Sequence, residues 1–266
     1  RLLAQLMTGA NARAMINTFF FNLNAVKSGA ARPGQTPRFK PRKVGLLGAG
    51  MMGAGIAFAQ ASRGMATVLK DVTLEKAEAG KAYSAKVTQS RVAKGRMGAD
   101  QQAHLLSLIH PTAENSDLAG CDLIIETVVE NRALKAQVTR EAEPLLAPGG
   151  FFASNTSTLP IGGLAQASAA PDKFIGIHFF SPVDKMKLVE IIRGPLTSDD
   201  TVAQAVDYVL GLGKLPIVVN DGRGFFTSRV FGTFVMEGVA MLSEGIPAAA
   251  IENAGTQCGM PVGPLA

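Results

Sequence analysis

The glycines of the segment GAGMMG, residues 48–53, have the spacing G-x-G-x-x-G. They follow the apolar run Lys43–Leu47 directly and precede Ala54–Ser62, a segment of helical character. Between a strand and a helix, the first glycine permits a tight turn, the second lets the backbone approach a pyrophosphate, and the third lets helix and strand pack closely. The phosphates would lie at the positive N-terminus of the helix. The motif therefore predicts a dinucleotide site around Gly48, Gly50 and Gly53.

A carboxylate follows at the position where such a site contacts the ribose. Asp71 comes 18 residues after Gly53, beyond the end of the next apolar run, Ala66–Leu69. A carboxylate there accepts hydrogen bonds from both ribose hydroxyls and repels a 2′-phosphate. The sequence therefore favours NAD over NADP.

A histidine and a glutamate form a second chemically active group. His178 lies near the end of the apolar run Phe174–Phe180, and Glu190 lies in the next run, Leu188–Ile192. A hairpin-like connection would bring the two within hydrogen-bond reach, and an imidazole held by a carboxylate can take a proton from a hydroxyl group near neutral pH. The spacing alone also suits a histidine that only packs in the core, so both interpretations stay open.

Seven apolar runs are the strand candidates that must position these residues. Those between Val44 and Phe152 are mostly continuous rather than alternating, and segments of helical character separate them, which is typical of a parallel sheet covered on both faces. The sequence therefore predicts a doubly wound α/β fold of the Rossmann type. The seven runs are Lys43–Leu47, Ala66–Leu69, Asp122–Glu126, Phe151–Ser154, Phe174–Phe180, Leu188–Ile192 and Leu215–Val219.

These elements divide the chain into three parts. Residues 1–40 are expected to form a helical linker segment, because their apolar pattern suits one or two helices and ends in a stretch with two prolines and a glycine. Residues 41–221 form the predicted dinucleotide-binding domain. After a break at residues 221–224, apolar residues recur at helical spacing, so residues 222–266 are expected to be the start of a second, helical domain that is incomplete.

Composition limits the remaining function classes. The chain has 266 residues, of which 47% are hydrophobic and 18% charged, so it can bury a sizeable core. Eight of the 26 Lys and Arg residues but no acid lie in residues 1–43, so the net charge of +5 belongs to that segment and we expect no nucleic-acid partner. No apolar run reaches the roughly 20 residues of a membrane helix. The distant Cys121 and Cys258 favour a reducing compartment and disfavour a zinc site.

From Lys43 onward the chain resembles the NAD-dependent L-3-hydroxyacyl-CoA dehydrogenases. The segment before Lys43 resembles the connecting helix and linker that precede this module in bifunctional fatty-acid oxidation enzymes, whose upstream half is an enoyl-CoA hydratase. Since the chain begins with Arg1, we expect it to be a piece of something longer, without the hydratase half. Four motifs carry the resemblance: GAGMMG at 48–53, ETVVEN at 126–131, SNTS at 154–157, and HFFSPV at 178–183 with MKLVE at 186–190.

The resemblance implies that a fatty acyl-CoA is oxidised at C3 from hydroxyl to ketone, as in β-oxidation, with NAD as the cofactor. The implied catalytic residues are His178 as the general base, Glu190 as its orienting partner and Ser157 as a hydrogen-bond donor to the reacting oxygen. Lys94 would approach the CoA phosphates, and Ser228 would contact substrate. The residues implied to line NAD besides the glycines are Met52, Asp71, Val128, Glu130, Lys135, Ser157 and Ser181.

The chain departs from the family pattern at two serines and at its end. Ser181 and Ser228 stand where family members commonly have Asn. The shorter side chain leaves open whether the contact is lost, mediated by water or specific to this branch. The family's helical domain continues past Ala266, helps to close the substrate cleft and forms the dimer interface of stand-alone members. The resemblance therefore leaves the substrate affinity of this chain open.

Two other functions also stay open. One is an NAD-dependent dehydrogenase of small hydroxy acids or sugar acids, but those enzymes commonly use a catalytic lysine, whereas this chain has the pair His178 and Glu190 with Ser157. The other is an NAD-binding assembly module of a multienzyme complex with little activity as this fragment. The expected partners are the missing hydratase half and a thiolase of a β-oxidation complex. Because no targeting segment stands out, we expect a bacterial cytoplasmic protein, with mitochondrial and peroxisomal locations as alternatives.

Overall fold

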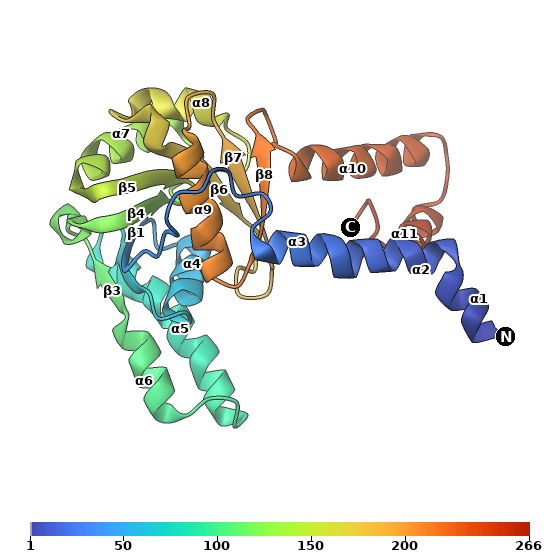
Figure 1. The fold of residues 1–266 in the computed structure, drawn as a ribbon, viewed down its shortest axis with the longest axis horizontal. Coiled ribbons are helices and arrows are strands. Elements are labelled where there is room, and N and C mark those ends of the chain that lie inside the picture. Colours follow the sequence, from blue (N-terminus) through green and yellow to red (C-terminus); the bar gives the residue numbers. More distant parts are fainter. Residues whose placement is uncertain (1) are drawn as a thin grey trace.

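A computed structural model describes residues 2–266, which contain one eight-stranded sheet (Figure 1). The strand order is β3-β2-β1-β4-β5-β6-β7-β8. Neighbouring strands are parallel except for β6 and β7, which form an antiparallel pair. The predicted α/β class is confirmed. The strands are β1 (Lys43–Leu47), β2 (Ala66–Lys70), β3 (Ile109–Thr112), β4 (Cys121–Glu126), β5 (Leu146–Ser154), β6 (Phe174–Phe179), β7 (Leu188–Arg193) and β8 (Leu215–Asn220).

Strand β3 is absent from the seven predicted strands. It has four residues, it pairs only with β2 at the edge of the sheet, and it contains Pro111. Proline lacks the N–H group of a ladder hydrogen bond, so its presence argues against a strand except at an edge. Strand β5 begins at Leu146, five residues before the predicted Phe151. The prediction starts too late because Pro148-Gly149-Gly150 has the composition of a turn.

Helices cover both faces of the sheet (Figure 1). Helices α4, α5 and α9 pack on one face, around buried side chains that include Ile56 and Val206, and α7 and α8 pack on the other, around Leu118 and Ile161. The α-helices are α1 (Leu2–Thr8), α2 (Ala10–Met15), α3 (Leu23–Ser28), α4 (Met51–Ala61), α5 (Leu74–Ala93), α6 (Ala99–Ser107), α7 (Arg132–Ala142), α8 (Ile161–Leu164), α9 (Asp199–Gly211), α10 (Thr227–Ser243) and α11 (Ala248–Gln257). Shorter helical turns lie at Asn115–Leu118, Glu143–Leu145, Ala165–Ala167 and Pro171–Lys173.

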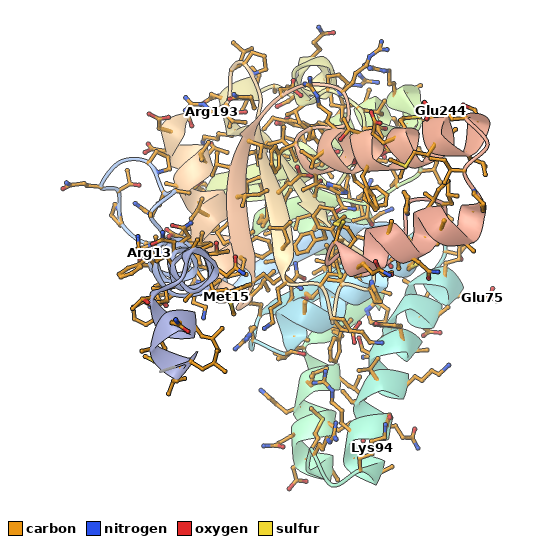
Figure 2. All side chains as sticks on the ribbon, turned by 90° about the vertical axis from the view of Figure 1, so that its right-hand side faces the viewer. Arg13, Met15, Glu75, Lys94, Arg193 and Glu244 are labelled. Carbon is orange, nitrogen blue, oxygen red and sulfur yellow. The ribbon has the colours of Figure 1, made fainter. Side chains whose placement is uncertain are left out.

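The two ends of the chain project from the β8 side of the sheet (Figure 1). A π-helical segment, Ile16–Asn22, joins α2 to α3, so residues 2–28 form almost continuous helix, and irregular chain leads from there into β1. Helices α10 and α11 project separately from the N-terminal helices, as the perpendicular view shows (Figure 2). Among the helices of residues 2–266, none is both long enough and apolar enough to cross a bilayer.

Candidate active site

The glycine motif forms the turn between β1 and α4. Gly48 has φ +100°, and a Cβ atom there would lie 2.9 Å from Thr127 Oγ1. A Cβ atom on Gly53 would lie 1.8 Å from the carbonyl oxygen of Gly48. At Gly50, by contrast, no atom of the described chain other than those of Gly50 and its two neighbours lies within 4 Å of the Cβ position. The first and third glycines are therefore required by the fold, whereas the second leaves open space beside the N-terminus of α4.

That open space fits the phosphates of a dinucleotide. Helix α4 begins at Met51, three residues before the predicted Ala54, since the end of the glycine motif forms its first turn. Within the described chain no side chain caps its first N–H groups, which leaves them available to an anion.

Asp71 directly follows β2, and its Oδ2 atom accepts a hydrogen bond from Ala49 N at 2.7 Å. The acid is thus held against the glycine turn, beside the region a ribose would occupy.

A cavity of about 370 Å³ lies where β4, β5 and β6 end. It brings together seven side chains from segments that lie far apart in the sequence, all of them predicted as site residues. These are Met52, Val128, Glu130, Lys135, Ser157, His178 and Ser181. The other lining residues are Thr127, Val129, Asn155, Phe179 and Phe180.

His178 and Glu190 form the predicted pair. They lie directly opposite each other on the antiparallel strands β6 and β7, and His178 Nδ1 lies 2.7 Å from Glu190 Oε2. Glu190 has no exposed surface. Burial favours a higher pKa for Glu190, but hydrogen bonds from His178 and Thr227 outweigh it and hold the pKa below its ordinary value. The carboxylate is therefore ionised at neutral pH, which fixes a proton on Nδ1 and leaves Nε2 as the ring nitrogen that can accept one.

The start of α10 supplies the remaining partners of Glu190. Its Oε1 atom accepts hydrogen bonds from Phe226 N at 3.1 Å and Thr227 N at 2.8 Å. Its Oε2 atom, which also faces His178, accepts a hydrogen bond from Thr227 Oγ1 at 2.7 Å. The buried carboxylate thus joins the sheet to the first turn of α10.

A second charged cluster beside the cavity consists of one lysine between two glutamates. Lys135, which is 2% exposed, contacts Glu126 at 2.9 Å and Glu130 at 3.3 Å. Burial raises the pKa of Glu126, and the Lys135 charge opposes that rise. Burial has the same tendency at Glu130, but hydrogen bonds from Ser157 N and the Thr156 hydroxyl, together with the charge of Lys135, lower its pKa. Lys135 is therefore a buried, paired cation rather than the solvated helix charge that its sequence context alone suggests.

Two predicted substrate residues lie outside this cavity. Lys94 is exposed at the C-terminal end of α5, and Figure 2 shows it near the far end of that helix, away from the sheet. Ser228 is exposed in the first turn of α10, next to Thr227. Their assignment to substrate stays a prediction.

Three residues that make hydrogen bonds within the site are not among the predicted site residues. Thr227 lies 37 residues after Glu190 and carries no motif that marks it. Asn155 Oδ1 accepts a hydrogen bond from Phe179 N at 2.9 Å and so ties β5 to the end of the histidine strand, although Asn155 lies within a quoted motif. Glu126 accepts hydrogen bonds from Lys135 and Ser154. For Glu126 the sequence does hold a signal: an acidic residue at the end of an apolar strand is expected to be buried, and a buried charge must be paired.

Comparison with known proteins decides the family. Residues 43–222 match the sequence family described as "3-hydroxyacyl-CoA dehydrogenase, NAD binding domain", and residues 224–266 match "3-hydroxyacyl-CoA dehydrogenase, C-terminal domain". The chain belongs to the 3-hydroxyacyl-CoA dehydrogenase family. Because the matched domain over residues 43–222 is an NAD-binding domain, the predicted family resemblance and the NAD cofactor are confirmed.

Solved structures of this family share the fold. The (S)-3-hydroxybutyryl-CoA dehydrogenase PaaH1 of Ralstonia eutropha is 35% identical, with a TM-score of 0.82 over 85% of this chain and 81% of that one. The 3-hydroxybutyryl-CoA dehydrogenase of Escherichia coli is 30% identical, with a TM-score of 0.82 over 85% of this chain and 48% of that one.

A curated relative is considerably longer than this chain. The fatty acid oxidation complex subunit alpha of Idiomarina loihiensis is 39% identical over 241 residues, which are 90% of this chain and 34% of the relative. The chain therefore spans about a third of the length of that protein.

Proposed function

We propose that this chain oxidises the 3-hydroxyl group of an (S)-3-hydroxyacyl-CoA to a ketone in fatty-acid β-oxidation. The observation that carries the proposal is the buried His178–Glu190 pair, whose histidine lines the same cavity as Ser157 and as Met52 of the glycine motif. When bound, NAD supplies the hydride acceptor.

His178 acts in this proposal as the general base. The Nδ1–H group donates a hydrogen bond to Glu190 Oε2 at 2.7 Å and keeps its proton, so Nε2 is free to take the proton of the substrate hydroxyl. The ionised Glu190 then stabilises the imidazolium that forms, as the carboxylate of a Ser-His-Asp triad does. In the reverse direction the imidazolium returns the proton to the ketone oxygen.

Ser157 is proposed to donate a hydrogen bond to the reacting oxygen. Its amide donates to Glu130 Oε1 at 2.9 Å, which fixes its backbone, while its hydroxyl lies 3.4 Å from the same oxygen and lines the cavity. A hydroxyl held so weakly can turn toward the substrate. Glu130 and Lys135 would hold the ribose and nicotinamide part of NAD, with Met52, Val128 and Ser181 around them and Asp71 at the other ribose.

The test is the reverse reaction, oxidation of NADH in the presence of acetoacetyl-CoA, followed at the absorbance band of NADH. We expect turnover, and in the forward direction a preference for the (S) over the (R) enantiomer of 3-hydroxybutyryl-CoA. NADH binding without turnover of either acyl-CoA would overturn the proposed activity of this chain.

We also propose a cellular setting from the relatives. The match to a bacterial fatty acid oxidation complex subunit alpha supports a bacterial cytoplasmic complex that includes a hydratase part and a thiolase partner. Within this chain, we propose that residues 1–40 act as a linker, residues 41–221 as the NAD-binding unit, and residues 222–266 as part of a substrate-binding helical unit.

A further inference from the structure

Glu190 is held by more donors than a simple histidine partner requires. Four hydrogen bonds reach its carboxylate, one from His178 and three from the first turn of α10. A fully buried carboxylate needs several donors to remain ionised, because burial alone favours the protonated form. Three of the four hydrogen bonds to Glu190 therefore come from the start of α10, and only one comes from the strand that carries the histidine.

The chain reaches this position through an unusual backbone. Gly224 has φ +71°, and Phe225, which is not a glycine, has φ +45°. A left-handed conformation at a bulky residue is strained and persists only where its surroundings hold it. Phe225 is buried, with its ring centroid 6.1 Å from that of His178. This turn directs the next two amide groups at Glu190.

We propose that Thr227 is a positioning residue for the dehydrogenase reaction, whose hydroxyl and amide hold Glu190 so that Glu190 can align His178. The proposal rests on the proposed function, because His178 must be the base. It assigns the start of α10 to the support of the catalytic pair, in addition to any contact of that helix with substrate.

The hydroxyl of Thr227 shares one oxygen with the histidine. Both Thr227 Oγ1 and His178 Nδ1 contact Glu190 Oε2 at 2.7 Å, whereas the two amides contact Oε1. A rotation of the carboxylate away from His178 would therefore break the bond to Thr227 as well. The elements against Glu190 are β6, β8 and the first turn of α10, which bring His178, Ile217 and Phe226–Thr227. Of these residues, His178 is the one with an ionisable side chain.

The direct variant is Thr227→Val, which keeps the branched shape of threonine and removes only the donor. We expect kcat to fall about 10- to 150-fold, as for a lost hydrogen bond to a charged group, with the affinity for NADH unchanged in calorimetry. In the oxidation of (S)-3-hydroxybutyryl-CoA, where His178 must be unprotonated, we also expect the acid limb of the pH profile to move to higher pH, because the His178–Glu190 pair loses a group that stabilises its carboxylate. Thr227→Ser, which retains the hydroxyl, should recover most of kcat.

The matched control is Thr233→Val on the same helix. Its hydroxyl donates to the carbonyl oxygen of Val230, within α10, so we expect wild-type kcat and pH profile. A second comparison places Thr227→Val in a Glu190→Gln background. If Thr227 acts through Glu190, the effect of Thr227→Val should largely disappear there.

Two results would overturn the proposal. One is wild-type kcat and pH profile in Thr227→Val, and the other is the same fold-loss with and without the Glu190→Gln change, which would indicate packing alone. Failure of the proposed function is a separate result, since wild-type protein would then not turn over acetoacetyl-CoA. In that case the ring N–H proton signal of His178 in NMR, assigned with His178→Gln, still reports on positioning: it shifts in Thr227→Val if the pair is held by Thr227 and stays in place if not.

Discussion

His178 and Lys135 both line the active-site cavity, and each is held by a buried glutamate. The first pair could be predicted, because two neighbouring apolar strands with a short connection place residues at opposite register positions. The pair of Lys135 and Glu126 could not be predicted from spacing. A lysine in a helix is expected to be exposed to solvent, and its burial follows only from the packing of α7 on β4. Residue-level prediction therefore succeeds where one local pairing decides the contact and fails where the contact depends on how a helix packs.

Asp71→Asn tests the ribose contact. Asparagine keeps an oxygen for the hydrogen bond from Ala49 N but removes the charge that disfavours a 2′-phosphate. We expect the affinity for NADH to fall about tenfold and the preference for NADH over NADPH to narrow, both measured by calorimetry. If the two affinities stay as in the wild type, the ribose contact lies elsewhere.

The turn between β1 and α4 is the element that the sequence predicts most fully. Local spacing specifies it, because a side chain at Gly48 or Gly53 would clash within the motif or with Thr127 at the end of the neighbouring strand. The seven predicted strands follow from continuous apolar runs in the same way. By contrast, the first turn of α10 reaches Glu190 across 36 and 37 residues of intervening chain, and no periodicity encodes such a contact.

Gly50→Ala separates cofactor binding from folding. Its backbone, with φ −65° and ψ −168°, suits any residue, and the added methyl group enters the open space that we assign to the phosphates. We expect an unchanged Tm with NADH affinity lowered at least about tenfold, because the backbone can no longer approach the pyrophosphate closely. Gly232→Ala in α10, where a Cβ also meets no atom of the described chain within 4 Å beyond its neighbours and the helix backbone, should leave NADH affinity unchanged. Equal NADH affinities of Gly50→Ala and the wild type would refute the phosphate assignment.

At the scale of the whole molecule, one buried acid ties the basic N-terminal segment to the body. Asp207 on α9 accepts hydrogen bonds from Arg32, from Arg38 and from the amide of Phe39. Burial favours a higher pKa for Asp207, but these donors outweigh it and lower the pKa. The segment before the sheet is therefore docked at its C-terminal end, while the helices before it project outward (Figure 1).

Asp207→Asn should destabilise the protein by about 3 kcal/mol at pH 7, because two arginines lose their shared acceptor. The lowered pKa means that the contribution is present above the unfolded-state pKa and is lost as the pH falls through the folded-state pKa. The urea unfolding free energies of variant and wild type should therefore converge in acid. Asp199→Asn, which removes the exposed partner of Arg193, should cost about 1 kcal/mol or less. A similar cost for both variants would show that Asp207 does not hold the segment.

The most direct test of the account compares wild type and His178→Gln in the oxidation of NADH by acetoacetyl-CoA, with NADH binding measured on the same preparations. Base catalysis contributes roughly 100- to 10,000-fold, so we predict a loss of turnover in that range with NADH affinity nearly intact. Wild-type turnover in His178→Gln would contradict the assignment of His178 as the base and, with it, the proposed mechanism.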